Sequence, residues 1–354
     1  MPYVCDRQAP SGAEGDFARM RTTADGLEIS VVVCTRNRAG PLGQLLTSMA
    51  AMEVPPGLAW ELLVVDNGSS DGTRNVVEAF AGRLPTRYTR EDLAGLSNAR
   101  NHGVREALGR YLCWTDDDVE VHPRWLAAYA EAFRAHPEAA VFGGRIEPRL
   151  EGPTPPWFAR LADLWPLNGI VAKRDFGPAP VRLDFSRDLV PWGANFAIRA
   201  EEQRKHVYDP QLGVSPAHRR SGEETQLMFE VMDAGAEGWW VPGSTVFHIF
   251  PPRRQSRRYF YEHFAAIGEG LAHLDHTRRT HAMNRDGKQP RQVYASPLFL
   301  TSVVWLNGAL FGAFHVIGMT RRSLYYLRRC GLYTGILAYR RSLPAAPQAQ
   351  TSPG

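Results

Sequence analysis

The 354-residue sequence predicts an α/β fold with a mostly parallel central sheet and flanking helices. Ile29–Cys34 and Trp60–Val65 are apolar at nearly every position, as expected of strands that are buried on both faces of a parallel sheet. A polar turn and a helical pattern follow each strand, over about Pro41–Met52 and Thr73–Phe80. This spacing is typical of a right-handed βαβ unit.

The rest of the chain continues the alternation of strands and helices. A helix runs from Gly95–Gly103 to about Leu108, and an apolar strand follows at Tyr111–Trp114. The residues of Gly152–Val181 are rich in proline, tryptophan and glycine and predict an irregular segment. The other expected elements are helices at Pro123–Ala135, Ser221–Ala234 and Tyr259–Leu271, and strands at Ala139–Gly144, Gly238–Val241 and Ser244–His248. Residues Pro191–Ile198 predict a turn that leads into a short strand.

Composition and motifs exclude several classes of protein. The net charge is +4, and much of the excess follows residue 250, which indicates a local basic patch and no nucleic-acid-binding body. The first strand runs into Cys34-Thr35-Arg36-Asn37-Arg38, so the dinucleotide fingerprint GxGxxG is absent, and so is a P-loop. The four cysteines show no CxxC spacing, which favours reduced thiols in the cytosol.

Three consecutive aspartates, Asp116, Asp117 and Asp118, follow the apolar strand Tyr111–Trp114. Adjacent carboxylates repel one another unless positive charge lies among them. A divalent cation such as Mg²⁺ or Mn²⁺ is the simplest source of that charge, because both ions prefer hard oxygen ligands. The alternative is a solvated acidic turn that caps the next helix.

Polar residues also follow the other predicted strands. Thr35 and Arg36 end the first strand, and Asp66 and Asn67 end the second. Ligands of open α/β sheets bind at the carboxyl ends of the strands, so these residues and the aspartates predict one shared site. Residues Gly95–Gly103 open a helix whose N-terminus and Arg100 could hold a phosphate. Ordinary capping by Ser97 and Asn98 is the alternative.

Residues 298–319 contain no Asp, Glu, Lys or Arg, a length sufficient to cross a bilayer core. Asn307, His315 and three glycines weaken that interpretation. Basic residues lie on both sides, so the positive-inside rule gives no orientation. We expect membrane contact, by a spanning, re-entrant or interfacial segment. The alternative is a buried helix of a soluble domain.

These features, taken together, resemble the inverting family 2 glycosyltransferases of the GT-A fold. Six segments match in family order and cover about residues 29–250, namely SVVVCTRNR, ELLVVDNGSSDGT, GLSNARNHG, YLCWTDDDVEV, WGANFAIRA and GEETQLMFEV. The resemblance implies a nucleotide-sugar donor (a UDP-, GDP- or dTDP-sugar) and Mn²⁺ or Mg²⁺ as cofactor.

The resemblance also implies roles for individual residues. Asp118 would hold the metal ion, and His248 would approach the metal or the diphosphate. The catalytic base would be Glu224, where the family has aspartate, with Glu223 second. Ser221 and Glu224 also have the spacing of a capping box, which would make Glu224 structural. The implied nucleotide-sugar-binding residues are Thr35, Arg36, Asn37, Asp66, Asn67, Asn98, Arg100, Asn101, Asp116, Asp117, Trp192 and Gly193. Asn195 would help to floor the sugar pocket, and Trp239 or Trp240 could stack on a sugar.

The expected function is metal-dependent, inverting transfer of a sugar to a hydroxyl of a glycan or lipid-linked acceptor, at the cytoplasmic face of the cell membrane. The expected organisation is a flexible tail (1–28), a GT-A domain (29–250), a basic and aromatic helical region (251–341) and a disordered tail (342–354). The alternative is a catalytically silent nucleotide-sugar binder or a scaffold of a glycan assembly complex. A nucleotidyltransferase would need a glycine-rich, lysine-bearing first loop, which this chain lacks. The donor base, the sugar, the acceptor and the oligomeric state stay open.

Overall fold

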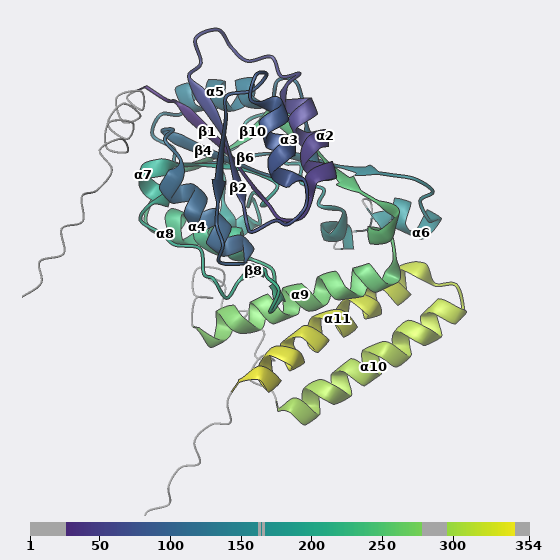
Figure 1. Ribbon diagram of the computed structural model, residues 1–354. Helices are drawn as coiled ribbons and strands as arrows, with labels where there is room; N and C mark the ends of the chain where they lie inside the picture. The colour runs from purple at the N-terminus through teal and green to yellow at the C-terminus, as the bar shows by residue number, and fades with distance from the viewer. Residues whose placement is uncertain (1–25, 162–163, 165–166, 278–295, 344–354) are drawn as a thin grey trace, which may run out of the picture.

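The computed structural model describes residues 26–161, 164, 167–277 and 296–343. The tails expected at 1–28 and 342–354 fall almost entirely outside these residues. The described chain forms an α/β domain and, beside it, a layer of three long helices (Figure 1).

The core of the domain is an eight-stranded sheet in the order β3-β2-β1-β4-β7-β6-β10-β5. Strands β3, β2, β1 and β4 are parallel to one another, whereas β7 is antiparallel to both of its neighbours and β5 is antiparallel to β10. The mostly parallel sheet predicted from the sequence is therefore confirmed. The strands are β1 (Ile29–Thr35), β2 (Trp60–Asp66), β3 (Thr86–Arg90), β4 (Tyr111–Asp116), β5 (Val119–Val121), β6 (Val141–Leu150), β7 (Asn195–Arg199) and β10 (Gly238–Phe250), and the separate short pair β8 (Gly213–Val214) and β9 (Arg219–Arg220).

Helices cover both faces of the sheet, because successive residues of the central strands point to opposite faces and are apolar on both. Val31 and Val33 of β1 pack with α2, α3 and α5, whereas Val32 packs with α4 and α8 on the other face. The helices of the domain are α2 (Ala39–Met49), α3 (Thr73–Phe80), α4 (Leu96–Glu106), α5 (Trp125–Ala135), α6 (Pro156–Ala159), α7 (Ala200–Gln203) and α8 (Glu223–Asp233).

Helices α9 (Arg257–His276), α11 (Thr320–Ser342) and α10 (Pro297–Val316) lie side by side in that order, with α9 next to the domain (Figure 1). Glycines allow α9 and α11 to approach closely. A Cβ atom at Gly335 would lie 1.9 Å from the carbonyl oxygen of Ala265, and one at Gly268 would lie 2.0 Å from that of Leu332. Residues 257–276 and 297–342 thus form one packed unit.

Several expected bounds were wrong. The strands expected at Gly238–Val241 and Ser244–His248 are one strand, β10, with an irregularity between Val241 and Thr245. Pro242 and Gly243 lie between the two expected strands, and this pair of residues predicted an interruption of the strand. Strand β3 was not predicted, because it is a half-exposed edge strand of mostly polar residues. Helix α5 starts at Trp125, after the expected Pro123, and β6 starts at Val141 and continues to Leu150.

Candidate active site

The polar residues predicted to share a site do converge at the carboxyl ends of three parallel strands. Strand pairing places Thr35 opposite Asp66 and Cys34 opposite Asp116. The Thr35 hydroxyl donates a hydrogen bond of 2.7 Å to Oδ2 of Asp117. These side chains lie together because the carboxyl ends of parallel strands meet at the same edge of the sheet.

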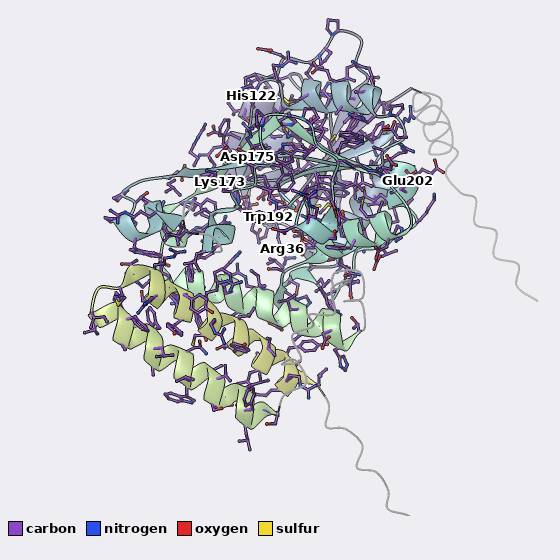
Figure 2. The ribbon with its side chains drawn as sticks, turned by 180° about the vertical axis from the view of Figure 1, so that it is seen from behind. Arg36, His122, Lys173, Asp175, Trp192 and Glu202 are labelled. Atoms are coloured by element: carbon purple, nitrogen blue, oxygen red, sulfur yellow. The ribbon has the colours of Figure 1, made fainter. Side chains whose placement is uncertain are left out.

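A cavity of about 570 Å³ opens at this edge, between the domain and α9. Its volume lies in the range of ligand sites. The cavity is lined by seven of the predicted residues, namely Thr35, Arg36, Asn67, Asp116, Asp117, Asp118 and His248. In Figure 2, Arg36 lies at the end of the domain that faces the helices, and His122 lies at the opposite end.

The cavity also contains residues that sequence reasoning missed, including Arg38, Arg219, Arg254, Tyr259 and His263. Two of these had a usable signal, because Arg38 is the second arginine of the predicted TRNR turn and Arg254 follows the last strand closely. The other three depend on how β9 and α9 fold over the site, which no local pattern indicates.

Asp118 is the most strongly paired acid in the cavity. Its Oδ2 lies 2.7 Å from Nη2 of Arg38 and 2.7 Å from Nη1 of Arg254, and its Oδ1 lies 3.2 Å from Nε2 of His248. Burial opposes ionisation of Asp118, but His248, Arg38 and Arg254 outweigh it and hold the pKa of Asp118 well below its ordinary value. Asp118 is therefore a carboxylate at neutral pH.

The other two aspartates differ from Asp118. Burial raises the pKa of Asp117 to about 7, although Arg38, 3.0 Å away, and the Thr35 hydroxyl favour its charged form. Burial also raises the pKa of Asp116, against the effect of Arg100. One run of aspartates therefore separates into groups with different affinities for protons.

Asp116, Asp118 and His248 could hold a metal ion, because one ligand atom from each lies within 4.8 Å of the others. The two carboxylates supply the oxygen ligands that Mn²⁺ and Mg²⁺ prefer, and the imidazole of His248 offers a nitrogen as the third ligand. Nδ1 of His248 is buried without a hydrogen-bond partner among the described residues. The side chains present therefore fit the expected cofactor.

Behind the aspartates lies a buried cluster around Arg100. Its guanidinium lies 3.7 Å from Asp116, 3.3 Å from Glu223 and 3.8 Å from Glu224. A Cβ at Gly193 would lie 3.2 Å from both Arg100 and Glu224, so glycine at 193 lets the loop before β7 pack against the cluster. Burial, then the charge of Glu224, raises the pKa of Glu223 to about 8.

The structure excludes the two side-chain caps that the sequence offered as alternatives. Helix α8 begins after Gly222, and no side chain caps it, so the capping box of Ser221 and Glu224 is wrong. Helix α4 begins after Gly95, likewise without a side-chain cap, because the Ser97 hydroxyl donates to the carbonyl of Leu212 and Asn98 donates to that of Ala94. The capping role that competed with catalysis for Glu224 is therefore excluded.

Other predicted residues have their side-chain atoms engaged in the architecture of the site. Asp66 accepts hydrogen bonds from the Ser69 amide and the Tyr88 hydroxyl, and Asn67 bonds the backbone of residues 91–95. Asn37, at a positive φ of 52°, accepts from the Ser70 amide. Contacts between these three residues and a donor stay a prediction.

Five further residues lie at the edge of the site or outside it. Asn101 bonds both the amide and the carbonyl of Tyr208, and Trp192 lies under the guanidinium of Arg174. Asn195 does not floor a sugar pocket, because it is fully buried and bonds Trp125, Tyr129 and two backbone carbonyls. Trp240 is also in the core, and Trp239 stacks on His136, so neither lines the cavity.

The sequence of this chain is similar to those of known glycosyltransferases. Residues 30–201 match the model of glycosyl transferase family 2. The chain is 33% identical to succinoglycan biosynthesis protein ExoM of Rhizobium meliloti over 139 residues, 39% of this chain and 44% of that protein. It is 30% identical to chondroitin synthase of Escherichia coli over 37% of this chain and 19% of the relative, and 30% identical to a validoxylamine A glucosyltransferase of Streptomyces hygroscopicus over 46% and 39%. The chain thus spans less than half of these relatives.

Solved structures agree with the fold. TarS residues 1–349 of S. aureus, in complex with UDP-GlcNAc, superpose with a TM-score of 0.53 at 16% identity, covering 89% of this chain and 92% of that one. The mannosyltransferase PcManGT of Pyrobaculum calidifontis, in complex with GDP-Man and Mn²⁺, superposes with a TM-score of 0.58 at 16% identity, covering 89% and 86%. The sheet and the converging strand ends are those of the GT-A fold, and residues 30–201, just under half of the chain, match glycosyltransferase family 2.

Proposed function

We propose that this protein is a metal-dependent inverting glycosyltransferase that moves a sugar from a nucleotide-sugar to a hydroxyl of a glycan or lipid-linked acceptor in the synthesis of a surface polysaccharide or glycoconjugate. The observation that carries the proposal is the grouping of Asp116, Asp118 and His248 within 4.8 Å, in a cavity that also contains Arg38 and Arg254. This cavity combines metal ligands with positive charge, which a nucleoside diphosphate requires.

Asp116, Asp118 and His248 would hold the metal ion. Bound there, Mn²⁺ or Mg²⁺ would neutralise charge on the leaving diphosphate. Arg38 and Arg254 now pair with Asp118, and both can turn toward a diphosphate, which offers planar guanidinium groups two oxygens each. Solved relatives that are complexed with UDP-GlcNAc and GDP-Man support a nucleotide-sugar donor.

Glu224 is the proposed base. It would take the proton of the acceptor hydroxyl as the hydroxyl oxygen attacks the anomeric carbon and the sugar–phosphate bond breaks. Glu223 is less suited, because a pKa of about 8 keeps it protonated at neutral pH. The side chain of Glu224 is also more exposed, at 18% against 7%.

The proposed acceptor belongs to a membrane-associated glycan, and the proposed location is the cytoplasmic face of the cell membrane. Helix α10 supports this location, because it is apolar along its length and only 11% of its apolar window is buried. The names of the relatives, which include a succinoglycan biosynthesis protein and a chondroitin synthase, support polysaccharide synthesis.

A thermal-shift screen with UDP, GDP, dTDP and their sugars, with and without Mn²⁺, tests donor binding. A ligand that binds only the folded state at one hundred times its Kd adds about 2.7 kcal/mol of stability. We expect one nucleotide series to stabilise the protein with Mn²⁺ present, and Asp118→Asn to abolish this effect. Asp92→Asn is the matched control, because its side chain is 82% exposed and does not line the cavity.

Release of free nucleotide from the preferred nucleotide-sugar tests catalysis. We expect Glu224→Gln to lower kcat by about 10²–10⁴-fold while donor binding is kept, since general base catalysis contributes that much. Glu78→Gln, on the surface of α3, serves as control. Donor binding without any transfer or hydrolysis would instead support the silent-binder alternative, and unchanged activity in Glu224→Gln would refute the assignment of the base.

A further inference from the structure

One face of α10 is an uncharged apolar stripe that no described residue covers. Leu298, Trp305 and Val316 lie 85%, 76% and 86% exposed, seven and eleven residues apart, and therefore on one face of the helix. We call these three residues the α10 stripe. The helix has 20 residues, which gives the stripe a length of about 30 Å.

The opposite face of α10 is already occupied by α11. Leu300 and Asn307, the two buried residues of α10, face it. Nε of Arg329 donates to Asn307 over 3.1 Å, and the carbonyl of Val304 accepts from the Cys330 thiol. These contacts are spread along α10, so α10 packs against α11 over much of its length. The asparagine that weakened the membrane interpretation is thus turned away from the apolar stripe.

Arginines of α11 border α10 at three levels. Arg322 lies over the ring of Phe314, Arg329 bonds Asn307, and Arg341 reaches the hydroxyl of Thr301. From residue 296 to residue 343 the sequence contains six arginines and no Asp or Glu. The apolar stripe therefore faces away from α11, and the arginines of α11 lie one helix layer behind it, where no acid of these two helices neutralises them.

From these contacts we propose that α10 lies flat in the surface of a bilayer rich in anionic lipid, with the α10 stripe among the acyl chains and the arginines of α11 at the headgroups. Binding by apolar insertion together with basic residues is the physics of interfacial helices. A second copy of this chain carries the same excess of positive charge in these helices and so offers no charge complementarity, whereas anionic lipid does. The lengthwise contact with α11 also argues against a single spanning helix. This proposal refines the membrane location and does not require transferase activity.

The test is flotation of the full-length protein with vesicles of phosphatidylcholine, alone or mixed with phosphatidylglycerol. We expect at least a tenfold higher partition coefficient with the anionic lipid, and loss of that gain near 1 M salt, where the Debye length falls to about 3 Å. Neutralising Arg322, Arg329 and Arg341 to Gln should also remove it, since each arginine near an anionic surface contributes roughly fivefold.

Trp305→Glu with Val316→Glu should abolish binding to either lipid, whereas Val207→Glu, at a site 63% exposed on the domain, should not change it. The circular dichroism and nucleotide-induced thermal shift of each variant report folding independently of lipid. Equal binding to neutral and anionic vesicles would overturn the arginine role. A dimer in light scattering that the two glutamates dissociate, without vesicle binding by the unmodified protein, would overturn the lipid surface in favour of a second copy.

Brominated lipids separate a flat helix from a spanning one. Quenching that is lost in Trp305→Phe should be stronger with bromines near the headgroup than with bromines near the bilayer centre. Stronger quenching from the bilayer centre would overturn the flat orientation.

Discussion

Replacement of Arg100 by methionine should strongly destabilise the protein. Arg100 is buried, and its guanidinium lies 3.7 Å from Asp116 and 3.8 Å from Glu224. At an effective dielectric constant of 20, each contact between unit charges is worth about 4 kcal/mol, before the cost of removing the charges from water. Methionine keeps an apolar chain near Phe196 and Tyr208 but leaves the carboxylates without a counter-charge.

We expect Arg100→Met to lower the free energy of unfolding by about 3–5 kcal/mol at neutral pH, the usual cost of removing one partner of a buried ion pair. The deficit should grow as pH rises. Without Arg100 the folded carboxyl groups have raised pKa values and hold protons that the unfolded chain has released, so stability falls with rising pH.

Urea unfolding at several pH values measures both effects. Arg105→Met is the matched control, because Arg105 lies on the same helix with 61% of its side chain exposed, and should cost under about 0.5 kcal/mol. Adding Glu223→Gln to Arg100→Met should recover part of the loss at high pH. A deficit under about 1 kcal/mol, or one that does not vary with pH, would refute this account of the cluster.

The remaining predictions concern titration, the core and the acceptor. Glu223, with its pKa raised from 4.5 to about 8, should make stability fall as pH rises between those values, and Asp117 should add to the fall between pH 3.8 and about 7. Glu223→Gln should flatten the profile measured by urea unfolding, and an unchanged slope would contradict the raised pKa. Asn195→Ala should cost about 3 kcal/mol or more, because it leaves the buried donors of Trp125 and Tyr129 and two backbone carbonyl acceptors unpaired. An unchanged melting temperature would show that these hydrogen bonds do not stabilise the core. Two helix spacings of about 8–10 Å separate the cavity from the α10 stripe, so kcat/KM should be higher for lipid-linked oligosaccharides than for a single sugar on the lipid, and the reverse order would place the bilayer elsewhere.

The sequence alone determined the elements whose pattern is local and strong. Strands β1, β2 and β4 are continuous apolar runs, and each ends in polar residues, so both the parallel sheet and the edge carrying Thr35, Asp66 and Asp116 followed from periodicity and topology. The capping box failed because its spacing is necessary for a cap but insufficient, and Gly222 gives the chain another way into α8.

Tertiary structure alone decided how charges pair across long stretches of sequence. Arg254 is far from Asp118 in the sequence. The pairing of β10 with β5 brings the Arg254 guanidinium to 2.7 Å from the Asp118 carboxylate. Packing also decided that Asn195 is a core residue and that Asn307 faces α11. Residues 298–319 are apolar in any fold, but the α10 stripe exists because α11 covers the other face of the helix. Local patterns report what a segment can bury, whereas the arrangement of its neighbours determines what it does bury.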